Sequence, residues 1–258
     1  MWRALLVVVA MAASAGAQPV TRPSHVAAKK HAKPKKKLKA KRRRVAKKLR
    51  RVTVEQQSVA LAAVGRVRYA GEMPPGFAWP ATPEMTMVER GCEAELDAQG
   101  IDWQRADALG KIADPIVAPK MTFGAIAYHS AFDKGPFVID CQLARMLARV
   151  GPSLWNLGVR DVAFGSTYRN TLVRFGGHTG KALSRHALGL AMDIVSFTDQ
   201  DGRVVKVESE YPKKNALLLA IEDLIDHDKD FRILLTPKND PISHHDHFHL
   251  EASVDFRP

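Results

Sequence analysis

The charged residues are distributed so unevenly along the chain that only part of it can form a core. Of 39 lysines and arginines, 17 fall within residues 1–51, which contain none of the 27 aspartates and glutamates. Residues 52–258 therefore carry 39 − 17 = 22 basic side chains against 27 acidic ones, a balance of −5. With 46% hydrophobic and 26% charged residues overall, the composition excludes a wholly disordered or collagen-like chain and leaves room for one or two compact domains.

The first 17 residues have the pattern of an export signal. Arg3 supplies a positive charge, residues 4–13 are uninterruptedly apolar, and residues 15–17 (Ala-Gly-Ala) offer a small-residue cleavage site. A membrane anchor is the alternative, but a run of ten apolar residues is short of the roughly 20 needed to span a bilayer. We therefore expect residues 1–17 to be a signal peptide, no transmembrane segment, and an exported protein of the periplasm or cell envelope.

Residues 18–52 are expected to form a disordered basic arm. Between Lys29 and Arg51 the sequence KKHAKPKKKLKAKRRRVAKKLRR contains fifteen lysines and arginines, and like-charge repulsion opposes a compact structure. Behind an export signal we expect no nucleic acid as partner. An anionic envelope surface fits better, with about 1 kcal/mol per basic residue near anionic lipid. The alternative is a solvated linker with no partner.

Residues 53–90 are expected to be an irregular covering segment. Residues 59–64 could make a short helix, but Pro74, Pro75 and Pro80 interrupt regular structure because proline lacks a backbone donor and restricts the residue before it. From Gly91 to Pro258 the pattern is that of a folded domain.

The pattern within residues 91–258 predicts an α+β domain built around an antiparallel sheet with packed helices. A tight turn at Asp201–Gly202 joins two of the expected strands. We expect strands at residues 159–165, 189–198, 203–207, 231–235 and 247–252. Apolar residues at helical spacing predict two core helices, one carrying Leu143, Met146, Leu147, Val150 and Leu154 and the other Leu217, Leu218, Ile221, Leu224 and Ile225.

Cys92 and Cys141 are the two cysteines of the chain. Because exported proteins usually pair their cysteines, we predict a disulfide between them. Closing a loop of about 50 residues stabilises the fold by up to roughly 4 kcal/mol in the chain-entropy model. Two buried thiols are the alternative.

Candidate metal ligands are concentrated in two places. Four of the ten histidines lie within residues 244–249, and His186 and Asp193 lie within the stretch 184–193. On a strand His247 and His249 would point to the same face. A catalytic zinc ion typically has three protein ligands and an open fourth position, so His186 and Asp193 could complete a site.

These motifs resemble those of the extensin-like C-terminal domain family of bacteria. That family is similar to zinc peptidases of peptidoglycan, including D-alanyl-D-alanine carboxypeptidases and dipeptidases and murein endopeptidases with a hedgehog-like fold. The shared features, which extend from about Cys92 to Leu250, are Ser-x-His-x6-Asp at residues 184–193, His-x-x-His-x-His at residues 244–249, and Tyr-Arg at residues 168–169.

The resemblance implies a role for each of these residues. His186, Asp193 and His249 would bind one Zn²⁺, and His247 would be the base that takes a proton from the attacking water. Arg169 would stabilise the developing oxyanion.

Three further residues belong to the expected site as positioning groups or alternatives. Ser184 is expected to orient His186 or its turn through a hydrogen bond. Asp246, three residues before His249, is an alternative base. If His247 were the ligand instead, His244 would stand three residues before it.

Two functions of different classes follow from this pattern. The first is a zinc metallopeptidase that hydrolyses amide bonds in the peptide stems of peptidoglycan, as an endopeptidase or a carboxypeptidase. The second is a non-catalytic, metal-bearing binding module of the cell envelope, because a fold does not by itself establish an activity.

Overall fold

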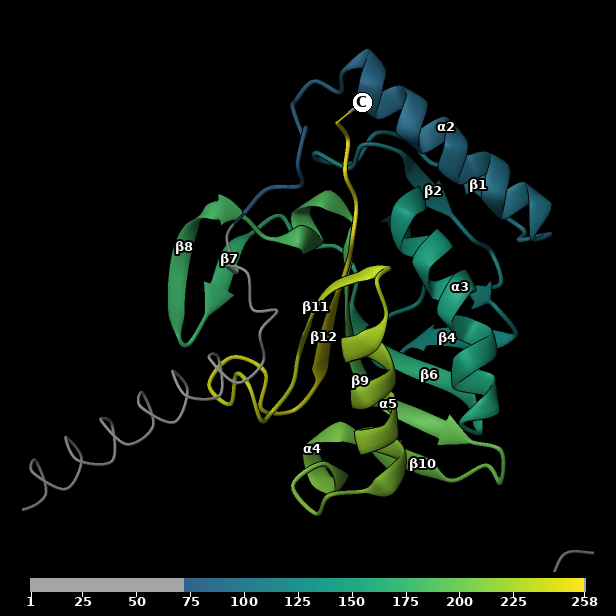
Figure 1. Cartoon of the computed structure of the whole chain (residues 1–258), viewed down its shortest axis with the longest axis vertical. Coiled ribbons are helices and arrows are strands. Elements are labelled where there is room, and N and C mark those ends of the chain that lie inside the picture. The colour runs from purple at the N-terminus through teal and green to yellow at the C-terminus, as the bar shows by residue number, and fades with distance from the viewer. Residues whose placement is uncertain (1–71, 258) are drawn as a thin grey trace, which may run out of the picture. The chain divides into compact units, whose positions relative to one another are not determined.

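The computed structural model describes residues 72–257 (Figure 1). The signal peptide, the basic arm, the possible helix at residues 59–64 and the first part of the covering segment lie outside the described residues. No helix in the described part of the chain is both long and apolar enough to cross a membrane.

A seven-stranded sheet forms the centre of the domain, which confirms the α+β class. Its strand order is β11-β12-β9-β6-β4-β3, with β10 also paired to β9. The strands are β3 (Thr122–Phe123), β4 (Ile126–Ser130), β6 (Val159–Ser166), β9 (Ala191–Asp199), β10 (Val204–Lys206), β11 (Phe231–Leu235) and β12 (Phe248–Ala252).

The sheet is antiparallel, as expected, except at one pair. Strands β4 and β6 run parallel, whereas the other pairs of this sheet are antiparallel. The chain between them passes through β5 (Val138–Asp140) and the helix α3 (Cys141–Asn156). A helical crossover of this kind returns the chain to the sheet in its original direction, which makes the sheet mixed.

The predicted strands are confirmed to within two residues at each end. The segment Phe231–Leu235 has the expected bounds, and β9 begins at Ala191 rather than at residue 189. The expected turn before β10 also forms, with Gly202 at a φ of 78° and its backbone N–H donating to the carbonyl of Asp199 at 3.0 Å.

Both expected core helices are present as α3 and α5 (Ala216–His227). The N-terminus of α3 is capped by Asp140, whose Oδ1 accepts a hydrogen bond from the backbone N–H of Gln142 at 3.0 Å. The apolar face of α3, which includes Leu143, Leu147 and Val150, is buried in the hydrophobic core next to the sheet.

A third long helix, α2 (Pro83–Ala98), corrects the expectation that the chain is irregular up to residue 90. Residues 72–82 are irregular as expected, but residues 83–90 are helical. The reason is that Pro83 stands in the first turn, where its missing N–H costs nothing, and Thr82 Oγ1 caps the helix by accepting from the backbone N–H of Met85 at 3.3 Å. Proline here starts a helix rather than interrupting one.

The predicted disulfide is confirmed and ties α2 to the start of α3. The sulfur atoms of Cys92 and Cys141 are 2.07 Å apart and their Cα atoms 6.1 Å apart. Both side chains are fully buried, so the bridge joins α2 to the core.

Two smaller sheets complete the described part of the domain. One has the strand order β1-β2-β5, with β1 at Gln104–Arg105 and β2 at Pro115–Val117. The other is the hairpin of β7 (Leu172–Phe175) and β8 (His178–Leu183), which stands beside the main sheet (Figure 1). The short 3₁₀ helix η1 (Arg185–Leu188) follows the hairpin, and the helix α4 (Val207–Glu210) follows β10.

Candidate metal centre

Three elements bring the expected ligands together. Asp193 on β9 and His249 on β12 are direct partners in the antiparallel register of these strands. His186 lies in η1, and Gly189 ends this turn with a φ of 68°. A Cβ atom at Gly189 would come within 2.7 Å of the backbone nitrogen of Asp140. Glycine is therefore required where the chain turns from His186 into β9.

The ligand atoms of the three side chains converge closely. His186 Nε2 lies 3.0 Å from Asp193 Oδ1 and 3.1 Å from His249 Nδ1. His249 Nδ1 lies 2.8 Å from Asp193 Oδ1. Ligands at zinc-bond lengths of about 2.0–2.1 Å in tetrahedral geometry stand roughly 3.3 Å apart. The spacing therefore fits one small cation.

The outer hydrogen bonds of the two imidazoles fix the direction of their lone pairs. The backbone carbonyl of Thr167 accepts from His186 Nδ1 at 3.0 Å, and Glu251 Oε1 accepts from His249 Nε2 at 3.1 Å. In the neutral rings, the nitrogens that face Asp193 therefore carry lone pairs rather than protons. Two lone pairs and a carboxylate oxygen that face one another form a donor set for a metal ion.

Electrostatics within the cluster favour a bound positive charge. Burial opposes ionisation of Asp193, but the neighbouring histidines outweigh it and hold the pKa of Asp193 well below its usual range. Burial lowers the pKa of His186. Burial also opposes protonation of His249, yet Asp193 and Glu251 raise the pKa of His249 to about 9. A proton would therefore compete with any metal ion for the same place.

Arg169 and Ser166 hold the second oxygen of Asp193. Arg169 Nη2 donates to Asp193 Oδ2 at 2.7 Å, and Ser166 Oγ donates to the same atom at 3.1 Å. About half of the Arg169 side chain remains exposed (48%). Arg169 thus touches the carboxylate of an expected ligand and still lines the neighbouring cavity.

His247 lies next to the cluster, with one ring nitrogen facing Asp193. Its Nδ1 donates to Asp246 Oδ1 at 2.7 Å. Its Nε2 is buried, has no hydrogen-bond partner among the described residues, and lies 3.5 Å from Asp193 Oδ1. Asp246, the alternative base, therefore contacts the cluster through His247 and not directly.

His244 is buried beside the cluster but is not one of the converging residues. Its ring centroid lies 5.0 Å from those of both His247 and His249, and its Nδ1 donates to Asp240 Oδ2 at 2.9 Å. Among the described residues, the histidine-containing group with ligand atoms all within 4.8 Å of one another is His186, Asp193 and His249. The geometry favours this set over the alternative in which His247 is the ligand and His244, three residues before it, is the base.

Ser184 lies where it can orient the His186 turn. As the N-cap of η1, its Oγ accepts a hydrogen bond from the backbone N–H of His186 at 3.3 Å. This bond fixes the start of the turn that carries the imidazole.

A buried ion network below His249 was not expected from the sequence. Glu251 Oε2 pairs with Arg232 Nη1 and lies 3.7 Å from Arg185 Nε. Burial opposes ionisation of Glu251, but His249 and the two arginines lower its pKa to about 2. Burial lowers the pKa of Arg185 to about 10. Side chains alternate along β12, so Glu251 lies on the same face as His249. This alternation is the sequence signal that could have revealed Glu251 as a neighbour of the ligand.

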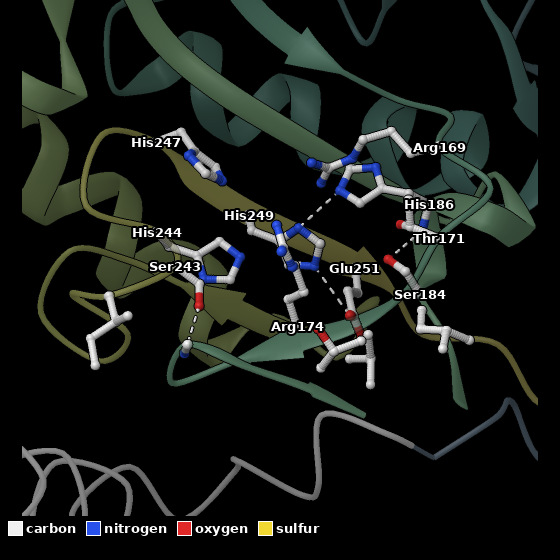
Figure 2. A pocket seen from close by; sticks show the side chains of 15 residues that line it. Arg169, Thr171, Arg174, Ser184, His186, Ser243, His244, His247, His249 and Glu251 are labelled. Atoms are coloured by element: carbon white, nitrogen blue, oxygen red, sulfur yellow. Dashed lines mark hydrogen bonds and ion pairs between the residues drawn. The ribbon is translucent and has the colours of Figure 1, made fainter. Parts of the chain in front are cut away.

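The cluster opens onto a cavity of about 780 Å³, shown in Figure 2. Its walls come from the β7–β8 hairpin and from the loop before β12. Two hydrogen bonds join these walls, from the backbone N–H of Gly177 to Ser243 Oγ at 3.2 Å and from that of Gly176 to Asp240 Oδ2 at 3.4 Å. The lining includes Arg169, Leu172, Arg174, Thr179, His186, Ile242, His244, His247 and His249.

These observations define a class of protein, a mixed α+β domain in which two histidines and an aspartate converge beside an open cavity. A sequence model of the family described as Extensin-like protein C-terminus matches residues 90–257. The chain belongs to this extensin-like family. No curated protein and no solved structure matches it.

Proposed function

We propose that this protein is a zinc-dependent hydrolase that cleaves peptide-stem amide bonds of peptidoglycan in the periplasm or cell envelope, on a fold of the hedgehog and D-Ala-D-Ala-peptidase type. One observation carries the proposal: two imidazole lone pairs and a carboxylate oxygen converge within 3.1 Å of one another. Beside them lies the buried His247 Nε2, which has no hydrogen-bond partner among the described residues and is 3.5 Å from Asp193 Oδ1. The choice of peptidoglycan rests on the motif resemblance and on the expected export.

His186, Asp193 and His249 would hold the ion. Two nitrogen donors and one oxygen donor suit zinc. When bound, zinc would supply Lewis acidity that polarises the scissile carbonyl and increases the acidity of the attacking water. Thr167 and Glu251 would keep both imidazoles in the ligating tautomer.

His247 would be the base. Because Asp246 accepts from His247 Nδ1, the Nε2 atom carries the lone pair and can take a proton from the attacking water and deliver it to the leaving amine. Burial opposes protonation of His247, but Asp193 and Asp246 outweigh it and raise its pKa. Asp246 would then act as a positioning residue.

Arg169 would stabilise the charge that develops on the carbonyl oxygen. Asp193 Oδ2 anchors one end of the guanidinium at 2.7 Å, and the exposed half of the side chain lines the cavity. Donors held in place before the reaction stabilise a transition-state oxyanion without reorganisation.

The activity test uses the zinc-loaded protein and purified muropeptides. We expect new amine groups and released D-amino acids or shortened peptides, measured by amine labelling and mass spectrometry. The His247→Ala variant should keep its zinc and lose about 10²- to 10⁴-fold in rate, the usual contribution of a general base.

His227→Ala is the matched control, because His227 lies on α5 with its side chain exposed (77%). Equal rates for wild type and His247→Ala would contradict the assigned base. Zinc-dependent binding of muropeptides without any product would instead support the non-catalytic binding module.

We also propose that the basic arm of residues 18–52 holds the protein at an anionic envelope surface. The sixteen lysines and arginines of the arm, each worth about 1 kcal/mol near anionic lipid, predict binding to vesicles of acidic phospholipid that weakens as salt is raised. Co-sedimentation of the mature protein and of a variant without residues 18–52 checks this. Identical binding by both would contradict it.

A further inference from the structure

Arg174 occupies a distinctive place in the cavity wall. It lies on β7, directly opposite Thr179 of β8, and both residues line the cavity that also contains His186 and His249. Figure 2 shows its side chain rising from the hairpin into the cavity, on the side of the labelled histidines. A guanidinium therefore faces any molecule that enters the candidate site.

The guanidinium of Arg174 has no acceptor in the described part of the chain. Within residues 72–257, the arginines other than Arg90 and Arg174 have a carboxylate or carbonyl partner; these are Arg105, Arg145, Arg149, Arg160, Arg169, Arg185, Arg203, Arg232 and Arg257. Arg90 is exposed on α2, outside the cavity lining. Arg174 is thus the unpaired arginine of the site.

The other charged side chains that line the cavity are already balanced. Arg169 pairs with Asp193, and Glu251 pairs with Arg185 and Arg232. Arg174 therefore leaves the cavity with an excess positive charge. An anionic group on the ligand would supply the missing partner.

The hairpin that carries Arg174 is held in position. Gly176 and Gly177 form its tip, with positive φ angles of 56° and 79°, and both donate backbone hydrogen bonds to the loop at Asp240 and Ser243. A guanidinium presented on a fixed strand can bind a carboxylate through two parallel hydrogen bonds.

We propose that Arg174 is a recognition site for a carboxylate of the peptide substrate, close to the amide that is cut. The assignment rests on the proposed function for its link to hydrolysis, but it makes a separate statement about binding. Two carboxylates of a lysine-type stem peptide share this chemistry: the C-terminal one and the α-carboxylate of an internal D-glutamate.

Three stem pentapeptides separate these sources: the free acid, its C-terminal amide, and the form in which the D-glutamate α-carboxylate is amidated. For each, binding to the zinc-loaded protein is measured by calorimetry, and kcat/KM by product formation. We expect one of the two amidations to weaken wild-type binding about 10- to 100-fold, the usual range for a hydrogen-bonded charge, and to lower kcat/KM to match.

In Arg174→Gln the same amidation of the peptide should change affinity by less than about 3-fold. The neutral glutamine side chain has no charge with which to favour a carboxylate over its amide. Arg90→Gln, the other unpaired arginine, should behave as wild type. Zinc content reports whether the variants keep an intact site.

The outcomes separate the two claims. Suppose that wild type binds the free acid more tightly than one amidated peptide, that Arg174→Gln does not, and that neither forms product. This result would contradict the hydrolase and support the carboxylate site. Equal binding of all three peptides by wild type, no binding of any, or undiminished discrimination in Arg174→Gln would each overturn the carboxylate site.

Discussion

Replacing Asp193 with asparagine is expected to abolish stoichiometric zinc binding and to reduce hydrolysis to background. The substitution keeps the size of the side chain but removes the negative charge that lies 3.0 Å from His186 Nε2 and 2.8 Å from His249 Nδ1. Changes to groups that only orient ligands cost about 10- to 100-fold in metal affinity, and loss of a ligand charge should exceed that. Zinc content after dialysis and a competition titration measure the effect.

Asp161→Asn is the matched control. Asp161 also pairs with a histidine, since its Oδ1 lies 3.0 Å from His129 Nδ1, but it stands on β6 and does not line the cavity. Zinc should raise the melting temperature of wild type and of this control, because a ligand that binds the native state stabilises it. One tightly bound zinc in Asp193→Asn would remove the metal centre as described.

The sequence was informative where residues of one kind, histidines or apolar residues, recur at the spacing of a strand or a helix. Alternation on the expected strand at residues 247–252 predicted that His247 and His249 point to the same side, and apolar spacing predicted α3 and α5. The strand β12 begins at Phe248, so His247 lies just before it. The strands could be placed because their residues are buried in the central sheet. The convergence of His186 with Asp193 followed from the motif resemblance.

Other features of the site and the fold leave no recognisable pattern in the amino-acid sequence. Thr167 contributes a backbone carbonyl, which every residue possesses. The parallel pairing of β4 with β6 is decided by how α3 packs. The β7–β8 hairpin is largely exposed, so Arg174 shows no periodic pattern, and its importance arises only when the hairpin meets the loop at Asp240.

Glu251→Gln is expected to cause the largest loss of stability among the substitutions considered, about 3–5 kcal/mol, the range for removing one partner of a buried ion pair. Glu251 is 4% exposed and Arg185 is 5% exposed, and Arg185 Nη1 has no hydrogen-bond partner in the described region. Without the carboxylate, the Arg185 charge would remain buried and unbalanced. Urea unfolding of the chelator-treated protein at pH 7 measures the difference.

The sign of the pH dependence follows from the pKa of Glu251. The folded protein lowers it from 4.5 to about 2, so Glu251 contributes stability above pH 4.5 that is lost as the pH falls through about 2. A shift of this size corresponds to about 3 kcal/mol, in agreement with the range from buried pairs. The stability difference between wild type and Glu251→Gln should therefore be largest between about pH 4.5 and 6.5 and shrink below this range. It should also decline as the pH rises through about 9, because Glu251 is one of the groups that raise the pKa of His249 from 6.5 to about 9.

Glu222→Gln provides the comparison for a buried glutamate whose ion-pair partner is exposed, since Lys238 Nζ lies 3.6 Å from Glu222 Oε1 at the surface. Glu222 is 8% exposed, and its Oε2 accepts a hydrogen bond from the Tyr211 hydroxyl at 2.7 Å. Glutamine can still accept that bond, so the loss should stay below about 1.5 kcal/mol. Because the amide oxygen introduced by Glu251→Gln could likewise still accept from His249 Nε2, that variant should keep zinc at 10- to 100-fold lower affinity. Equal stability losses in the two variants would show that the arginine network contributes nothing beyond burial of a polar group.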